Sequence, residues 1–89
     1  MTVFTVQNNV AAARDVIIYL EPEGRGERQN LGTVGAGAQA QFRHNAPRGY
    51  YTLITAHNLG ETRSDRFNVT APSTVTWMMG TNRVVVSRR

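Results

Sequence analysis

The stretch FNVTAPSTVTW, residues 67–77, contains two short runs in which apolar and polar side chains alternate. The apolar positions are Phe67 and Val69 in the first run and Val75 and Trp77 in the second. A period of two predicts a β-strand with one buried face. The segment Ala71–Ser73 between the runs contains a proline, whose fixed φ favours chain reversal. The stretch therefore predicts a strand, a turn and a second strand.

The same alternation recurs along the rest of the chain. The predicted strands are Thr2–Gln7, Asp15–Leu20, Gln29–Val34, Ala38–His44, Tyr50–His57, Thr62–Val69, Thr74–Met79 and Arg83–Arg88. Turn residues separate them at the spacing typical of sandwiches, and Asn9–Arg14 is long enough for a single helical turn only. About seven to eight short strands bury their apolar faces by stacking as two sheets. We therefore predict one all-β domain over residues 1–89, an antiparallel immunoglobulin-like β-sandwich.

The closing stretch WMMGTNRVVVSRR, residues 77–89, fits the last hairpin of such a sandwich. Gly80-Thr81-Asn82 is the predicted turn. A two-residue loop would place Trp77 opposite Val86, an aromatic and β-branched pair that stabilises neighbouring strands. We predict that Trp77 is a core residue and that Met79 fills the space beside it.

The composition excludes several classes of protein. The net charge is +4, every basic residue is arginine, and cysteine is absent. Disulfides, thiolate zinc sites and thiol nucleophiles are therefore impossible. No apolar run approaches the roughly 18 residues of a membrane helix, and no signal peptide opens this chain. We expect membrane association only through a partner or a removed lipid anchor.

The sequence offers no strong candidates for catalytic residues. Glu21, Glu23 and Glu27 lie in a loop rich in proline and glycine, where solvent keeps carboxylates ordinary. None of the common nucleotide-binding or nucleophile motifs is present. We expect no enzymatic activity, no catalytic residues and no cofactor.

A metal site is also not expected. His44 and His57 are the only histidines. If Ala38–His44 and Tyr50–His57 form a hairpin, the two imidazoles lie more than about 20 Å apart, at about 3.3 Å per strand residue. They then sit at strand ends on the surface and cannot share an ion.

Several strands carry apolar residues on both faces. The candidates for a protein interface are Ile17, Tyr19, Ile54 and Val85. One interpretation is a contiguous patch for self-association or docking, and the other is isolated exposed residues of the ordinary kind. The predicted strands Ala38–His44 and Val84–Arg88 also offer edges for strand addition.

The arginines permit a second kind of partner. The candidates for contact with an acidic ligand are Arg43, Arg48, Arg63, Arg66, Arg83 and Arg88. Tyr50 and Tyr51 could add stacking surfaces. Because the arginines are scattered and no recognised nucleic-acid motif is present, a nucleic-acid partner is disfavoured. Polyanionic carbohydrate fits the same charges.

Three segments carry a resemblance: DVIIYL at residues 15–20, LGTV at residues 31–34, and the opening stretch at residues 67–77. Together they resemble small extracytoplasmic β-sandwich modules of bacteria, of the transthyretin-like or carboxypeptidase-regulatory-like kind. The resemblance implies a non-catalytic structural or protein-interaction role, in a larger periplasmic or extracellular assembly or a homo-oligomer. It implies no site residues. Binding of an acidic ligand is the alternative.

Overall fold

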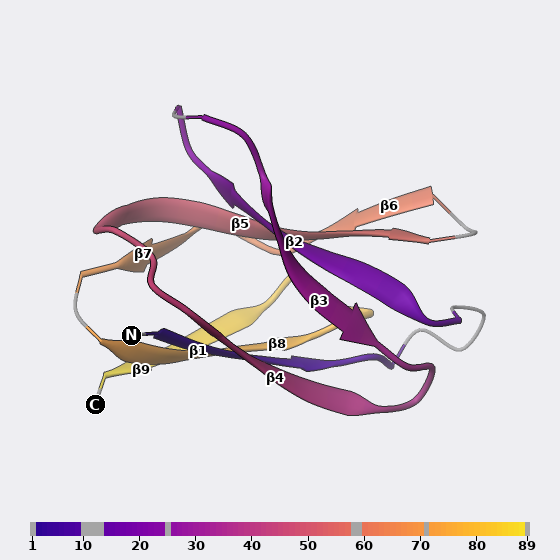
Figure 1. The fold of residues 1–89 in the computed structure, drawn as a ribbon. Helices are drawn as coiled ribbons and strands as arrows, with labels where there is room; N and C mark the ends of the chain where they lie inside the picture. The colour runs from indigo at the N-terminus through magenta and orange to yellow at the C-terminus, as the bar shows by residue number, and fades with distance from the viewer. Residues whose placement is uncertain (1, 10–13, 25, 58–59, 71, 89) are drawn as a thin grey trace.

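The computed structural model describes residues 2–9, 14–24, 26–57, 60–70 and 72–88, and within them every regular element is a β-strand (Figure 1). The strands are β1 (Thr2–Gln7), β2 (Val16–Pro22), β3 (Gln29–Val34), β4 (Gln39–His44), β5 (Gly49–His57), β6 (Gly60–Arg63), β7 (Phe67–Val69), β8 (Ser73–Met78) and β9 (Val84–Arg88). They form two sheets, as predicted for an all-β sandwich.

The first sheet has the strand order β4-β1-β8-β9, and the second has the order β3-β2-β5-β6 with β7 also paired to β5 (Figure 1). β1 pairs with β4 antiparallel and with β8 parallel. The expectation of a wholly antiparallel sandwich is therefore wrong at β1–β8. β1 lies between two partners, and its residues from Thr2 to Val6 are all buried.

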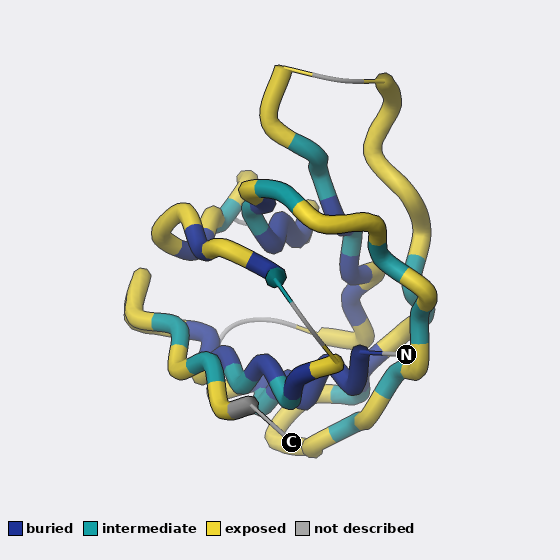
Figure 2. Tube along the Cα trace, turned by 90° about the vertical axis from the view of Figure 1, so that its left-hand side faces the viewer, coloured by how far each residue is buried: buried dark blue, intermediate teal, exposed yellow. Residues whose placement is uncertain are grey.

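The core lies between the sheets and follows the alternation of the sequence. Phe4, Ile18, Leu53 and Trp77 are all fully buried. The Trp77 indole N–H donates a 2.9 Å hydrogen bond to the backbone oxygen of Thr81, which satisfies the polar atom of the ring inside the core. In Figure 2, by contrast, the β2–β3 hairpin projects away from the buried residues, and the described residues next to its turn are exposed.

Several expected boundaries agree with the structure. Those of β1 and β3 coincide with the predicted ranges. The predicted strand Thr62–Val69 is divided into β6 and β7, because Ser64 leaves the regular ladder. Its hydroxyl oxygen accepts the backbone N–H of Leu53 at 2.9 Å. The expected helical turn at Asn9–Arg14 lies largely outside the described residues.

Two expected pairings are wrong. β4 and β5 do not form a hairpin, because β4 pairs with β1 and β5 pairs with β2 in the opposite sheet. The separation of the histidines derived from that hairpin therefore has no basis. In the last hairpin Trp77 faces Val84 rather than Val86. The connection is shorter than expected, because only the six residues 78–83 separate Trp77 from its partner, and the N–H of Thr81 closes a turn within it by donating to the Met78 carbonyl at 3.3 Å.

Candidate functional site

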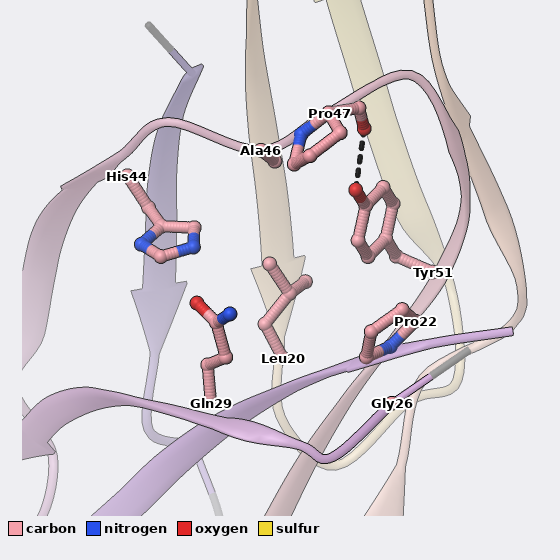
Figure 3. A pocket seen from close by; sticks show the side chains of 8 residues that line it. All are labelled: Leu20, Pro22, Gly26, Gln29, His44, Ala46, Pro47 and Tyr51. Carbon is pink, nitrogen blue, oxygen red and sulfur yellow. Dashed lines mark hydrogen bonds between the residues drawn. The ribbon is translucent and has the colours of Figure 1, made fainter.

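An open cleft of about 190 Å³ lies where the end of β4 and the following loop meet β2, β3 and β5 (Figure 3). Its lining residues are Leu20, Pro22, Gly26, Gln29, His44, Ala46, Pro47 and Tyr51. Both sheets contribute, so the cleft is an opening into the space between the two layers. Sequence reasoning did not identify it.

Strand register explains why these side chains meet. Leu20 lies opposite Gln29 across β2 and β3, and Pro22 lies opposite Tyr51 across β2 and β5. Cross-strand partners share one face of a sheet. Because Leu20 and Tyr51 are almost completely buried, this is the face turned toward the other sheet.

His44 reaches the cleft from the other layer. Ala40, Phe42 and His44 are the half-buried positions of β4, and the residues between them are exposed. His44 therefore continues the inward-facing set, which corrects the expectation of a simple surface histidine at a strand end. The sequence signal was present: Ala40 and Phe42 alternate with polar residues, and two residues further along the strand the same face is occupied by His44.

One wall of the cleft is held by a hydrogen bond. The Tyr51 hydroxyl donates to the backbone oxygen of Pro47 (Figure 3). The Tyr51 ring also stacks on Phe67, with 6.3 Å between the ring centroids. This bond ties the β4–β5 loop to the second sheet, so the proline wall and the tyrosine wall are positioned together.

The cleft has an apolar side and a polar side. Figure 3 places the His44 imidazole and the Gln29 carboxamide on one side of Leu20, and Pro22, Pro47 and Tyr51 on the other. Neutral imidazole and carboxamide groups each both donate and accept hydrogen bonds. The arrangement can therefore bind a small apolar group that carries a polar substituent.

The structure separates the residues expected at a protein interface. Ile17, Tyr19 and Ile54 lie on the outer face of the β3-β2-β5-β6 sheet, whereas Val85 belongs to β9 of the other sheet. Ile17 is 38% exposed, but Ile54 is fully buried, which corrects its expected exposure. Its cross-strand neighbours Tyr19 and Arg63 share its face, so their longer side chains flank it.

A network of ion pairs spans this outer face. Arg28 contacts Glu21 at 3.2 Å and Glu61 at 3.4 Å, and Arg63 contacts Glu61 at 3.1 Å and Glu21 at 3.5 Å. The Arg28 guanidinium also lies 5.6 Å from the centre of the Tyr19 ring. Arg63, a candidate for an acidic ligand, is therefore engaged by two carboxylates of its own chain.

Val85 belongs to a different apolar surface. Val85 is 55% exposed and Met78 is 51% exposed, and both line a shallow hollow of about 220 Å³. The hollow also contains Thr76, Thr81 and Arg83. Met78 was not among the predicted interface residues. The alternation of Val75 and Trp77 on the inner face nevertheless indicates that Met78 lies on the outer face.

The arginines do not form one continuous stripe. Arg48 and Arg66 meet Glu23 and Tyr50 around an open hollow of about 380 Å³. Arg66 lies 4.3 Å from the centre of the Tyr50 ring and 3.0 Å from Glu23.

The remaining arginine candidates belong to the other sheet. Arg43 is an exposed residue of β4, Arg83 lines the hollow beside Val85, and Arg88 ends β9 with its side chain outside the described part. In the strand order β4 and β9 are at opposite edges, so Arg43 is separated from Arg83 and Arg88.

Comparison with models of known protein families and with curated protein sequences gave no match.

Within the described residues, no helix has the length and apolar character needed to cross a bilayer.

Proposed function

We propose that this chain is a non-catalytic structural or protein-interaction module, of the transthyretin-like kind, that works in a larger extracytoplasmic assembly. In immunoglobulin constant-type sandwiches the first two strands share a sheet. Here β1 and β2 belong to different sheets. This order supports the transthyretin-like alternative within the resemblance that the sequence carries.

The observation that carries the interaction role is the exposed apolar surface beside β9. Val85 and Met78 are each more than half exposed and line the same hollow. β9 ends the strand order of its sheet, and such an edge presents backbone N–H and C=O groups to an added strand. A partner segment can therefore gain both backbone hydrogen bonds and apolar contact here.

The charges beside β9 favour a particular partner. Arg83 precedes the strand and Arg88 ends it. A second copy paired antiparallel through β9 would bring like charges together at both ends. An extended segment with an apolar centre and acidic ends fits this edge better. We therefore propose such a segment of another protein as the occupant.

The test is binding of a synthetic peptide with alternating valine and threonine between terminal glutamates, measured by fluorescence anisotropy. Val85→Asp should weaken binding at least about tenfold, because it places a carboxylate in the apolar contact. Ile17→Asp is the matched control on the opposite sheet and should leave binding unchanged. Equal loss of peptide binding in both variants would contradict the proposal. So would failure of the chain to bind either this peptide or a version with lysines in place of the terminal glutamates.

Light scattering across a concentration series separates the two kinds of association. The proposed partner-binding role predicts a monomer at all concentrations without peptide. Concentration-dependent dimers that Val85→Asp abolishes would show that a second copy occupies the edge instead.

A second candidate function is binding of an acidic ligand, such as a polyanionic carbohydrate, at Arg48 and Arg66. Arg66 is supported by Tyr50 and Glu23, and only one of its terminal nitrogens is used in the ion pair with Glu23. Arginine presents five N–H donors, so such a supported guanidinium can still contact a sulfate or carboxylate. This candidate requires affinity that falls as salt rises from about 50 to about 200 mM.

The variants distinguish it from general surface charge. Arg66→Ala should weaken binding to heparin, whereas Arg63→Ala should have little effect because Glu21 and Glu61 already engage that side chain. Equal loss in both variants would contradict a localised site.

A further inference from the structure

We propose that the cleft between the two sheets binds an aromatic ring that carries one hydroxyl group. This inference is independent of docking at β9, since the cleft lies beside β2, β4 and β5 and shares no residue with the hollow of Met78 and Val85. The ligand class follows from the size, the polarity and the rigidity of the cleft.

Size sets the first limit. A volume of about 190 Å³ is slightly larger than the engineered cavity of about 150 Å³ that binds benzene. It is smaller than the roughly 300–1,000 Å³ of pockets for drug-sized ligands. The cleft therefore suits one six-membered ring with a single small substituent.

The apolar walls specify a flat hydrophobic body. Leu20 forms the floor, and Pro22, Pro47 and the Tyr51 ring stand on one side of it (Figure 3). These groups offer dispersion contacts and remove apolar surface of the ligand from water. Proline rings and an aromatic side chain have few rotatable bonds, so little conformational entropy is lost when a ring is bound.

The polar side specifies the substituent. The Gln29 carboxamide and the His44 imidazole lie together on the side of Leu20 opposite Tyr51 (Figure 3). A phenolic hydroxyl both donates and accepts a hydrogen bond, which matches the mixed capacity of these two side chains. A ring without a polar atom would leave them desolvated without a new partner.

The walls of the cleft are held in place before any ligand binds. Tyr51 is tied to the Pro47 carbonyl and packed on Phe67. Pro22 is fixed opposite Tyr51 by strand pairing. Preorganised walls reduce the cost of association, so even a single ring should bind with a dissociation constant on the order of 1 mM.

The test is titration of the full chain with phenol, followed by ¹H–¹⁵N NMR. The expected result is saturable shifts of the Gln29 side-chain amide and of the Ala46 backbone amide, with toluene bound roughly three- to tenfold more weakly because it lacks the hydroxyl. The Met78 and Thr81 amides, in the hollow beside β9, should not move. Shifts that are absent or spread over both regions would overturn the proposal.

Two variants localise the effect. Gln29→Ala changes an exposed residue and should weaken phenol roughly three- to tenfold, whereas toluene should bind no more weakly, because it makes no hydrogen bond to Gln29. Ala46→Leu should fill the cleft and abolish binding of both rings. If Ala46→Leu does not fold, Gln29→Ala alone decides, and equal effects on phenol and toluene would contradict the assigned hydrogen bond.

The same ring chemistry has two possible sources, a free phenol or a tyrosine side chain of another protein. N-acetyl-tyrosinamide is the probe for the second source, because it presents the tyrosine side chain on a peptide backbone. Tighter binding of this compound than of phenol would identify a tyrosine-bearing segment, and its exclusion with phenol still bound would identify a small-molecule ligand. Failure of both compounds to bind would overturn the site, whatever peptides do at β9.

Discussion

At the scale of single residues, the closest constraint lies between Gly32 and Phe42. Gly32 has a φ of 145°, a conformation that residues with a side chain rarely adopt. A Cβ added there would lie 2.5 Å from a ring carbon of Phe42. Because Gly32 is on β3 and Phe42 is on β4, the missing side chain allows the two sheets to approach at this edge.

Gly32→Ala should therefore destabilise the fold by about 2–4 kcal/mol, from backbone strain and from overpacking against Phe42. Gly37→Ala is the matched control, since Gly37 has a φ of 70° but no atom within 4 Å of the added Cβ. It should cost only about 1 kcal/mol of backbone strain. Urea unfolding measures both values, and equal losses would show that the contact with Phe42 contributes nothing.

Tyr51→Phe tests the bond that holds the wall of the cleft. Removing the hydroxyl leaves the Pro47 carbonyl without this donor. Because Pro47 is exposed, water can replace the hydroxyl. The free energy of unfolding should fall by about 0.5–1.5 kcal/mol. An unchanged thermal midpoint together with unchanged amide shifts at Ala46 would contradict a positioning role for this bond.

At the scale of elements, a side chain in the segment between β6 and β7 replaces a backbone hydrogen bond to β5. The Ser64 hydroxyl accepts the backbone N–H of Leu53 and donates to the backbone oxygen of Asp65 at 3.0 Å. The Ser64 N–H donates to the Leu53 carbonyl at 2.9 Å. β5 thus stays paired through the break between the two short strands.

Ser64→Ala should cost about 1–3 kcal/mol, because it leaves the N–H of Leu53 buried without its acceptor. Native-state hydrogen exchange measures the effect directly. The Leu53 amide should exchange faster in the variant by more than the global loss of stability explains. Ser87→Ala is the control, as Ser87 is exposed on β9, and it should leave the exchange of Leu53 unchanged.

The same elements show what sequence could and could not predict. The strands were predictable where side chains alternate, because burial of one face imposes a period of two, as in β1 and β8. The break at Ser64 was not, because it depends on a hydrogen bond to a residue of another strand. The wrong β4–β5 hairpin has a similar cause, since the Asn45–Arg48 connection crosses between sheets and local turn signals do not record the partner of a strand.

The candidate sites were less predictable than the strands. Exposure of Val85 follows from local alternation, and that position was anticipated. Burial of Ile54 depends on Tyr19 and Arg63, which are distant in sequence and flank it only after β2, β5 and β6 pair. The cleft required His44, Gln29 and Tyr51 to converge from three strands, which no local pattern specifies.

At the scale of the whole molecule, the central position of β1 determines how the fold can form. β1 is paired with β4 and with β8, so the first residues of the described chain must meet strands formed much later in the sequence. Closing such long loops costs conformational entropy before any contact is gained. The sheet β4-β1-β8-β9 cannot assemble from local hairpins alone.

Folding should therefore take milliseconds to seconds, as in other sandwiches dominated by non-local pairing. Trp77 is the only tryptophan and pairs with Val6 of β1, so its fluorescence reports the meeting of β1 and β8. Stopped-flow refolding from urea should give a slow fluorescence phase that Val6→Ala retards if β1 docks in the transition state. Val84 is the partner of Trp77 on β9, so Val84→Ala reports formation of the local β8–β9 hairpin instead. Refolding in microseconds would mean that sheet formation does not wait for β1, and the central parallel pair would then form after the rate-limiting step.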